Sequence, residues 1–215
     1  DLSKIEAGKL VFEEVEFDLR ELIGNTMKSI SFRSRSPHVE LAYCLDPRIP
    51  KIFRGDPTRL RQVLVNLLSN ALKFTKEGEV VLEATVEAET DRDICLGIKV
   101  RDTGIGIKPD RLKMIFNPFE QEDSSTTRQY GGTGLGLAIT TGILRVVGGK
   151  LSAESEVGRG STFQFRWKFP KLAAPAASDE NSLDLQFNSA VIIDDHEATS
   201  KYLSESIECF GLAAH

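Results

Sequence analysis

The sequence predicts an α+β fold, because short segments that alternate apolar and polar residues are interspersed with longer segments whose apolar residues recur at helical spacing. Residues 94–100 show the first pattern, and residues 57–74 show the second. Strands and amphipathic helices of this kind bury their apolar sides against each other. The pattern therefore agrees with a two-layer α/β sandwich.

The predicted elements follow one another from the first residue to about residue 169. The first is the tail of a helix, and an extended segment comes next. In chain order the predictions are a helix tail at 1–9, an extended segment at 10–16, a helix from 18 to about 30, a strand at 39–45, a helix at 57–74, strands at 79–88 and 94–101, a helix at 135–147, and strands at 149–156 and 161–169.

Local capping chemistry justifies the two longer helices. Asp18 is the expected N-cap of the first, and Glu21 completes a capping box three residues later. Asp56 is the expected N-cap of the second, where Pro57 takes the first helical position and needs no hydrogen-bond partner for its nitrogen.

Alternation justifies the strands. Val39, Leu41, Tyr43 and Leu45 alternate with Glu40, Ala42 and Cys44. The last two strands flank the turn 157–160 and are predicted to form a hairpin. Large apolar side chains on one face of the second hairpin strand are expected in the core: Phe163, Phe165, Trp167 and Phe169.

Composition limits the function classes. The chain has 215 residues and a net charge of −5, with basic and acidic residues interspersed, so we expect no nucleic-acid partner. Its three cysteines have neither a zinc nor a disulfide spacing. No apolar run reaches the roughly 20 residues that cross a bilayer, and the chain starts without Met or a signal peptide. We expect a cytoplasmic fragment of a longer protein, whose remainder can be anchored in the inner membrane.

The helix 57–74 carries a polar stripe opposite its leucines. Amide oxygens suit Mg²⁺ and a lysine suits phosphate oxygens, so the stripe is typical of a metal–phosphate site. A solvated polar face would give the same pattern on this helix alone. The stripe consists of Arg59, Gln62, Asn66, Asn70 and Lys73.

A second candidate lies at the end of the strand 94–101. Asp102 is followed by Gly104 and Gly106, and glycine permits a close approach of the backbone to a ligand. An ionised carboxylate there can accept a hydrogen bond from an exocyclic amine such as that of adenine. The alternative interpretation is a turn closed by an Asx hydrogen bond.

A third candidate is the glycine-rich segment 131–136, which opens a helix. Free backbone N–H groups and the helix dipole favour a phosphate there. The segment is not a Walker A loop, because no Gly-Lys-Ser/Thr ends it. It is not a dinucleotide fingerprint either, because the preceding residues are polar rather than a buried strand.

Together these segments resemble the ATP-binding domain of histidine kinases. NLLSNALKFT, DTGIGI, IFNPFEQ and GGTGLGL are similar to the N, G1, F and G2 boxes of that family. Their order and spacing fit the Bergerat-type ATP-binding fold that histidine kinases share with gyrase, Hsp90 and MutL. The resemblance covers roughly residues 1–170. It implies a mixed, mainly antiparallel sheet with helices on one face.

The resemblance implies ATP and Mg²⁺ as cofactors and a role for each matching residue. Asn66 would bind Mg²⁺, Asn70 and Lys73 would lie at the phosphates, and Asp102 would bind the adenine amine. Phe116 and Phe119 would anchor a mobile lid at 117–131. Arg128 would reach the γ-phosphate, with Asn66 and Lys73 as the other catalytic residues, and Tyr130 would pack near the nucleotide. The remaining nucleotide-binding residues would be Gly104, Gly106, Ile107, Phe119, Gly132, Thr133, Gly134, Leu135 and Gly136.

The polar stripe also separates a kinase from a hydrolase. The ATP-hydrolysing relatives carry a Glu one helical turn before the second Asn, where it can activate water as a general base. This sequence has Asn66 there, and a neutral amide does not take up a proton at pH 7. Phosphoryl transfer to another acceptor is therefore favoured. A gyrase-type hydrolase and a non-catalytic interaction module are the alternatives.

The acceptor that the resemblance implies is a histidine on a dimerisation domain. His38, His196 and His215 do not lie in an acceptor motif, so we expect this fragment to bind ATP without phosphorylating itself. The acceptor domain would belong to the same or a partner subunit of a homodimeric parent, an enzyme of the protein-histidine kinase class.

The resemblance also sets the domain boundaries. Residues 1–9 would end a dimerisation helix, 10–170 would form the catalytic domain, and 171–189 have the composition of a linker. Residues 190–215 resemble the start of a doubly wound response-regulator receiver domain, with Asp194 and Asp195 as its Mg²⁺-binding pair. A receiver domain is thus an expected partner, and a hybrid kinase the expected parent.

Overall fold

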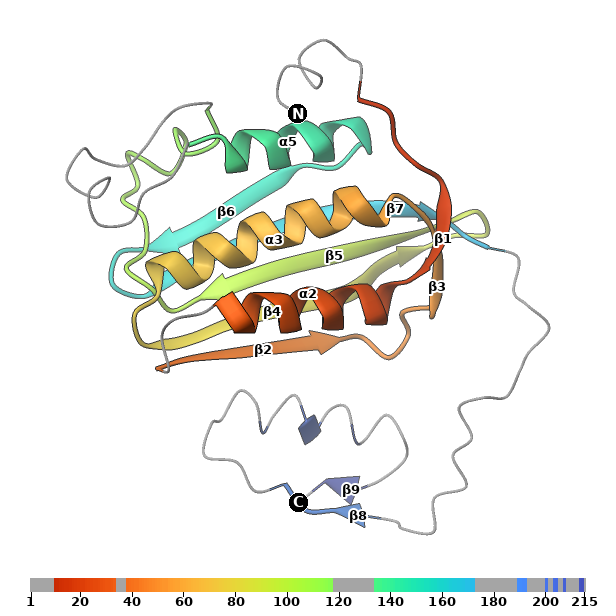
Figure 1. Ribbon diagram of the computed structural model, residues 1–215, viewed down its shortest axis with the longest axis horizontal. Helices are drawn as coiled ribbons and strands as arrows, with labels where there is room; N and C mark the ends of the chain where they lie inside the picture. Colours follow the sequence, from red (N-terminus) through yellow and green to blue (C-terminus); the bar gives the residue numbers. More distant parts are fainter. Residues whose placement is uncertain are drawn as a thin grey trace.

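The computed structural model describes residues 10–33, 38–117, 134–172 and 189–192, together with positions 200, 203, 204, 207, 213 and 214. Its main body is a five-stranded sheet that carries helices on one face (Figure 1). In chain order the elements are β1 Val15–Asp18, α2 Leu19–Arg33, β2 Val39–Leu45, β3 Ile52–Gly55, α3 Pro57–Phe74, β4 Gly78–Glu89, β5 Asp93–Asp102, α5 Gly136–Val146, β6 Leu151–Glu156, β7 Gly160–Pro170, β8 Ser189–Ala190 and β9 Ala213–Ala214.

The main sheet has the strand order β2-β4-β5-β7-β6. Only β2 and β4 pair in parallel, and the other three pairs of this sheet are antiparallel. A parallel pair requires a crossover connection, and the chain between β2 and β4 supplies one that contains α3. The expected two-layer α/β sandwich with a mixed, mainly antiparallel sheet is therefore confirmed.

The predicted elements agree closely with the observed ones. The strand 39–45 and the helix 57–74 have the predicted bounds, and β6 and β7 form the predicted hairpin. The first helix continues to Arg33, beyond the predicted end near residue 30. The short strand β3 was not predicted. It pairs with β1 through Val15↔Gly55, a contact between distant segments that local periodicity does not reveal.

The hydrophobic core lies between the sheet and α2, α3 and α5. Every residue of the alternating row Ile94, Leu96, Ile98 and Val100 is at most 2% exposed. The aromatic row of β7 is also buried, as predicted, and Phe169 contacts Phe53 with ring centroids 4.8 Å apart. Burial of one such ring contributes about 1.5–3 kcal/mol, so this end of the sheet is strongly stabilised.

The other face of the sheet is polar. Ion pairs link the strands there: Arg101 of β5 pairs with Glu79 of the adjacent β4, and Arg166 of β7 pairs with Glu87 of β4 across the intervening strand β5. Ion pairs at the solvent side of a protein contribute about 0–1 kcal/mol each. They therefore keep this face hydrophilic and add little to the stability of the sheet. The sheet therefore has a core face under the helices and a charged face towards solvent.

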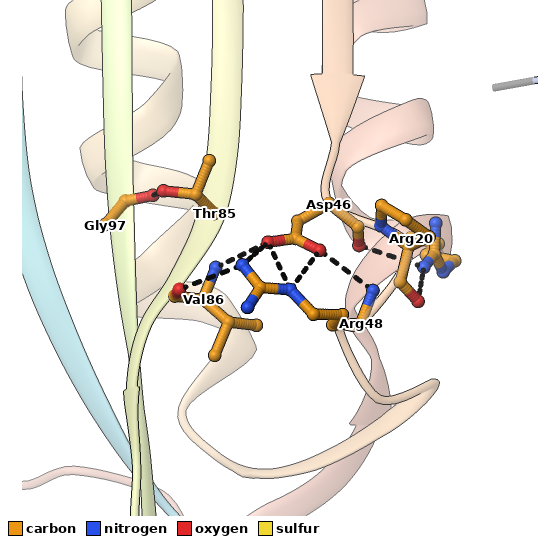
Figure 2. A network of polar contacts seen from close by, with 7 residues as sticks. Arg20, Asp46, Arg48, Thr85, Val86 and Gly97 are labelled. Atoms are coloured by element: carbon orange, nitrogen blue, oxygen red, sulfur yellow. Dashed lines mark hydrogen bonds and ion pairs between the residues drawn. The ribbon is translucent and has the colours of Figure 1, made fainter. Parts of the chain in front are cut away.

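A polar clamp fixes the end of β2 (Figure 2). Asp46 accepts hydrogen bonds from Arg48 Nη2 at 2.6 Å and from the backbone nitrogen of Val86 at 3.2 Å. Arg20 of α2 donates to the backbone carbonyls of Asp46, Pro47 and Ile49, each at 3.3 Å. The Arg48 side chain is the main cause that lowers the pKa of Asp46 to about 2, against the opposing effect of burial. The clamp joins α2, β2 and β4.

No helix within the described part of the chain is long and apolar enough to cross a membrane.

Candidate functional site

The site is built around α3, whose position is fixed by its caps and its apolar side. Asp56 Oδ1 accepts a hydrogen bond from the Arg59 backbone nitrogen at 2.9 Å, and Pro57 occupies the first turn, as predicted. The buried residues of α3 face the core: Leu60, Val63, Leu64, Leu67, Leu68 and Ala71. This anchorage turns the polar stripe away from the core.

The polar stripe divides into two parts. Arg59 Nη1 donates to Gln62 Oε1 at 2.7 Å, so these two side chains bind each other at the beginning of the helix. Asn66, Asn70 and Lys73 follow at successive turns and are all half-buried. The second part of the stripe is therefore the one that offers amide and ammonium groups to a ligand.

Asn66 links α3 to the beginning of α5. Its Nδ2 donates to Thr140 Oγ1 at 2.9 Å. Its Oδ1 lies against Gly136, where an added Cβ would be only 2.1 Å from that oxygen. A side chain at position 136 would therefore displace the Asn66 amide. The structure thus brings the first helix of the candidate site into contact with the glycine-rich segment that the sequence placed in the same site.

Lys73 lies in the last turn of α3. Its Nζ is 4.8 Å from the centroid of the Phe74 ring, a cation–π contact. Burial lowers the pKa of Lys73, because desolvation disfavours the charged ammonium. An anionic ligand would offset that desolvation, so the position is suited to a phosphate group.

Asp102 ends β5 and is 6% exposed. Its Oδ1 accepts hydrogen bonds from the backbone nitrogens of Gly104 at 2.9 Å and Ser161 at 3.3 Å. Among the described residues, none donates a hydrogen bond to Oδ2. Burial raises the pKa of Asp102, and the two backbone donors act in the opposite direction. The carboxylate is held by one oxygen and has the other oxygen available as an acceptor.

The loop that follows Asp102 contacts the C-terminal end of α3. The Ile105 backbone nitrogen donates to the Phe74 carbonyl at 3.2 Å, and a Cβ at Gly104 would lie 2.4 Å from the same oxygen. Gly106 has φ +69°, in the left-handed region that favours glycine. The hydrogen bond from the Gly104 backbone nitrogen to Asp102 Oδ1 is the Asx hydrogen bond of the turn interpretation, so that interpretation is confirmed. A turn and a ligand-binding role are compatible at this carboxylate.

Two serines that the sequence analysis did not single out support this loop. Ser155 Oγ accepts a hydrogen bond from the Ile107 backbone nitrogen at 2.7 Å and lies 2.9 Å from Ser161 Oγ. Both serines lie on the core-facing rows of the hairpin, in line with Ala153 and Phe163. A hydroxyl at the end of an apolar row is the signal that would have found them.

The remaining predicted residues divide between described and undescribed parts of the chain. Gly134 has φ +68°, and Leu135 accepts the Ile139 backbone N–H at 2.9 Å as the N-cap residue of α5. Phe116 is half-buried against the core. Phe119, Arg128, Tyr130, Gly132 and Thr133 lie outside the described residues, as do Asp194 and Asp195.

A separate hollow of about 320 Å³ lies at the hairpin end of the sheet. Asp102 is the only predicted ligand-binding residue that lines it. The strand register places Arg101, Glu154 and Thr162 of this hollow on the charged face. Asp102, Ser155 and Ser161 line it from the helix side, so the hollow adjoins the carboxylate and the serines that support the glycine loop, although no residue of α3 or α5 lines it.

Comparisons with known proteins agree with this geometry. The family described as histidine kinase-, DNA gyrase B- and HSP90-like ATPases matches residues 55–171. The sensor protein GacS of Pseudomonas syringae pv. syringae is 40% identical over 215 residues, which is 99% of this chain and 23% of that protein. Hybrid signal transduction histidine kinase L of Dictyostelium discoideum is 44% identical over 172 residues, 80% of this chain and 10% of that protein.

A solved structure is similar over the whole chain. Full-length ShkA in complex with AMPPNP has a TM-score of 0.80 and 28% identity, and the match covers 100% of this chain and 42% of ShkA. The chain spans less than a quarter of the length of the curated relatives named above.

Proposed function

This chain belongs to the histidine kinase-, DNA gyrase B- and HSP90-like ATPase family, as the ATP-binding catalytic domain of a two-component sensor histidine kinase. From that premise we propose that it binds Mg-ATP between α3, the glycine loop 103–107 and the beginning of α5. The γ-phosphate is then transferred to a histidine on a dimerisation domain outside this chain. The parent protein is proposed to be a homodimeric hybrid kinase that works in the cytoplasm.

The observation that carries the proposal is the Asp102 carboxylate. Its Oδ1 is held by two backbone N–H groups, so the side chain cannot rotate freely, and Oδ2 has no donor among the described residues. A fixed, desolvated carboxylate oxygen is a strong and directional acceptor. The exocyclic amine of adenine is a donor of the matching kind, which supports Asp102 as the adenine-binding residue.

The phosphate end of the proposed site is supported by the chemistry of α3 and α5. Lys73 offers an ammonium group, and its burial favours a bound anion. Gly134 and Gly136 open α5, whose first-turn N–H groups lack partners within the helix. A phosphate at that helix N-terminus gains both these donors and the helix dipole.

The donor set also fits a magnesium ion. Asn66 and Asn70 carry amide oxygens, which are the hard ligands that Mg²⁺ accepts beside phosphate oxygens and water. Within the described part of the chain, no group of three or more His, Cys, Asp or Glu side chains is placed to hold a metal ion. Asn66 would hold the metal, which would neutralise charge on the phosphates.

Transfer rather than hydrolysis is supported by the residue type at position 66. An amide cannot serve as the general base for a water molecule, and the Asn66 amide nitrogen is already engaged by Thr140. ATP bound here would therefore persist until an acceptor histidine arrives. Arg128, outside the described residues, is proposed to stabilise the transferred phosphoryl group.

The C-terminal segment is proposed to begin a receiver domain. β8 and β9 pair in parallel through Ser189↔Ala213 and Ala190↔Ala214, which is the pairing that a strand–helix–strand unit produces. A receiver domain and a dimerisation domain are therefore the proposed protein partners. The linker expected at 171–189 is proposed to lie between Lys171, whose backbone still bonds to the sheet, and Ser189, which begins β8.

A nucleotide titration tests the adenine assignment. We expect Mg-dependent binding of a non-hydrolysable ATP analogue to weaken about 10- to 100-fold in Asp102→Ala, because a hydrogen bond to a charged group is worth about 1.5–3 kcal/mol. Asp110→Ala is the matched control, since Asp110 is exposed. Equal affinity of the Asp102→Ala variant and the wild-type chain would reject the assignment.

A transfer assay tests the reaction. Incubation with labelled ATP and a separately supplied dimerisation domain should label that domain, while the chain alone remains unlabelled. Steady-state release of phosphate from the chain alone, dependent on Mg²⁺, would instead favour a gyrase-type hydrolase. Binding of ATP without either outcome would favour a non-catalytic module.

A further inference from the structure

The glycine loop 103–107 lies along the β6–β7 hairpin, which contacts it through both backbone and side-chain atoms. The Gly158 backbone nitrogen donates to the Ile105 carbonyl at 2.8 Å. At the end of the loop, the Ile107 backbone nitrogen donates to Ser155 Oγ at 2.7 Å. The first bond joins two backbones and survives most substitutions, whereas the second depends on one side-chain hydroxyl.

The Ser155 hydroxyl is fully used by its neighbours. A hydroxyl has one proton to donate and two lone pairs that accept. The Ile107 N–H can only donate, and the Gly160 carbonyl, 2.9 Å from Ser155 Oγ, can only accept, so the direction of both bonds is fixed. The remaining lone pair meets the Ser161 hydroxyl at 2.9 Å. No hydrogen-bonding capacity is left for a ligand, so Ser155 acts through its neighbours.

The two hairpin residues that Ser155 contacts also contact Asp102. The Ser161 backbone nitrogen donates to Asp102 Oδ1 at 3.3 Å. Gly160 is so close that a Cβ there would be 1.9 Å from the Asp102 carbonyl oxygen. Ser155 therefore joins the carboxylate that precedes the glycine loop to Ile107 at the end of the loop.

We propose that Ser155 is a positioning residue for the adenine end of the nucleotide: its hydroxyl holds Ile107 at a fixed place relative to the Asp102 carboxylate. This inference rests on the proposed function, because it takes Asp102 as the adenine acceptor. The groups of a binding site must be held within about 0.5 Å of their productive positions, and hydrogen bonds behind them supply that constraint. Packing against the core holds the Ile107 side chain, and Ser155 holds its backbone.

Three substitutions separate the hydroxyl of Ser155 from other effects. Ser155→Ala removes the hydroxyl and leaves the backbone contacts of the hairpin. Ser155→Thr keeps the hydroxyl, and threonine is favoured in strands. Ser152→Ala is the matched control. Ser152 lies on the opposite face of the same strand, where its hydroxyl donates to the Gln164 carbonyl at 3.4 Å, away from the glycine loop.

The test measures the affinity for a non-hydrolysable ATP analogue with Mg²⁺ by calorimetry, in the wild-type background and in Asp102→Ala. In the wild-type background, Ser155→Ala should weaken the affinity about 3- to 10-fold, the size expected for one hydrogen bond. In the Asp102→Ala background it should weaken the affinity by less than about 2-fold, because the acceptor that Ser155 positions is gone. Ser155→Thr and Ser152→Ala should bind as the wild-type chain does.

A second measurement needs no nucleotide. Hydrogen exchange of the Ile107 amide, followed by NMR, should become about 3- to 10-fold faster in Ser155→Ala, because the N–H loses its acceptor. The exchange rate should keep its wild-type value in Ser155→Thr and Ser152→Ala. If Ser155→Ala does not fold, Ser155→Cys replaces it, since the thiol fills the space with a much weaker hydrogen-bonding group.

An unchanged affinity in Ser155→Ala, an equal fold-loss in the Asp102→Ala background, or an unchanged exchange rate of the Ile107 amide would each overturn the role of Ser155. A loss in Ser155→Thr or Ser152→Ala as large as that in Ser155→Ala would do the same. A wild-type chain that binds no nucleotide would overturn the proposed function, and the adenine role of Ser155 with it. Nucleotide binding in the wild-type chain, combined with unchanged affinity in Ser155→Ala, would overturn the role of Ser155 alone.

Discussion

Gly106 lies so close to the backbone of Glu156 that a Cβ at Gly106 would be 2.1 Å from the Glu156 carbonyl oxygen. The contact is accompanied by a hydrogen bond from the Gly158 backbone nitrogen to the Ile105 carbonyl at 2.8 Å. The glycine loop is thus seated on the turn of the β6–β7 hairpin, and the hairpin turn determines where the loop can lie.

Gly106→Ala should therefore destabilise the chain more than a glycine replacement in open space. Both Gly106 and Gly158 have positive φ, +69° and +80°, but a Cβ at Gly158 would meet nothing within 4 Å. We expect Gly158→Ala to lower the free energy of unfolding by about 1 kcal/mol and Gly106→Ala by about 3 kcal/mol or more. Urea denaturation measures both. Equal losses would show that backbone conformation alone, without the contact to Glu156, sets the cost.

The half-buried Lys73 should set an upper pH limit on nucleotide binding. Its lowered pKa means that the ammonium loses its proton at a lower pH than an exposed lysine does. Affinity for the anionic phosphates should fall as the pH rises through that pKa. Lys73→Arg keeps its charge at every accessible pH and should retain affinity where the wild-type chain loses it.

Lys76→Arg, at an exposed position after α3, is the control for the Lys73 variant. It should follow the wild-type pH profile measured by titration with a non-hydrolysable analogue. A Lys73→Arg profile that falls in parallel with the wild-type profile would mean that another group causes the decline.

The clamp at Asp46 should make stability dependent on pH in acid. The pKa of Asp46 is about 2 in the folded chain and 3.8 for an unperturbed Asp carboxyl, so the carboxylate favours the folded state above pH 3.8. That contribution is lost as the pH falls from 3.8 towards 2. The shift corresponds to at most about 2 kcal/mol, reduced by solvent screening because Arg48 is exposed.

Asp46→Asn should lower the free energy of unfolding at neutral pH and flatten its slope between pH 4 and pH 2, the interval that the pKa of Asp46 sets. Asp91→Asn, at an exposed position, should leave both unchanged. Guanidinium titrations at several pH values provide the comparison. A slope in Asp46→Asn as steep as that of the wild-type chain would assign the acid dependence to other carboxylates.

The proposed boundary after β7 predicts where the chain can be shortened. Lys171 donates its backbone N–H to the Arg92 carbonyl at 2.7 Å and pairs with Glu89 at 2.6 Å, so the sheet contacts extend to this residue. We expect a chain that ends at Leu172 to keep its thermal stability and its nucleotide affinity. A chain that ends at Gln164 loses Phe165, Trp167 and Phe169 and should not fold. A marked drop in stability on ending at Leu172 would place the boundary later.

The sequence could predict those features that depend on nearby residues. The N-cap residue Asp56 is only three residues from Arg59, whose backbone nitrogen it binds. Asp56 and Pro57 therefore predict the beginning of α3 from adjacent residues alone. The alternation of β5 is likewise local. Partnerships between distant segments were less accessible: Asn66 and Thr140 are 74 residues apart, and no periodicity relates them. The only sequence feature that could have pointed to Thr140 is the presence of a hydroxyl residue on the buried side of a helix.

In the candidate site, too, features set by nearby residues were predicted and contacts between distant segments were not. Asp102 and the glycines were predicted because their residue types are unusual at those positions. Ser155 was missed because a serine near a turn is common, and its contact with Ile107 spans 48 residues. The family resemblance implied a mixed, mainly antiparallel sheet without saying which strands are parallel. Strand periodicity does not reveal strand direction, so the parallel pairing of β2 with β4 was not predicted.

The main sheet contains two local hairpins, β4–β5 and β6–β7, joined edge to edge by the non-local pairing of β5 with β7. Asp102 ends the first hairpin, and the Ser161 nitrogen that holds it belongs to the second. The proposed adenine acceptor thus exists only after the two halves of the sheet have come together, a late step because the closing loop is long. Bound nucleotide would therefore hold the β4–β5 and β6–β7 hairpins together. A partly unfolded chain in which the two hairpins have separated would release the nucleotide.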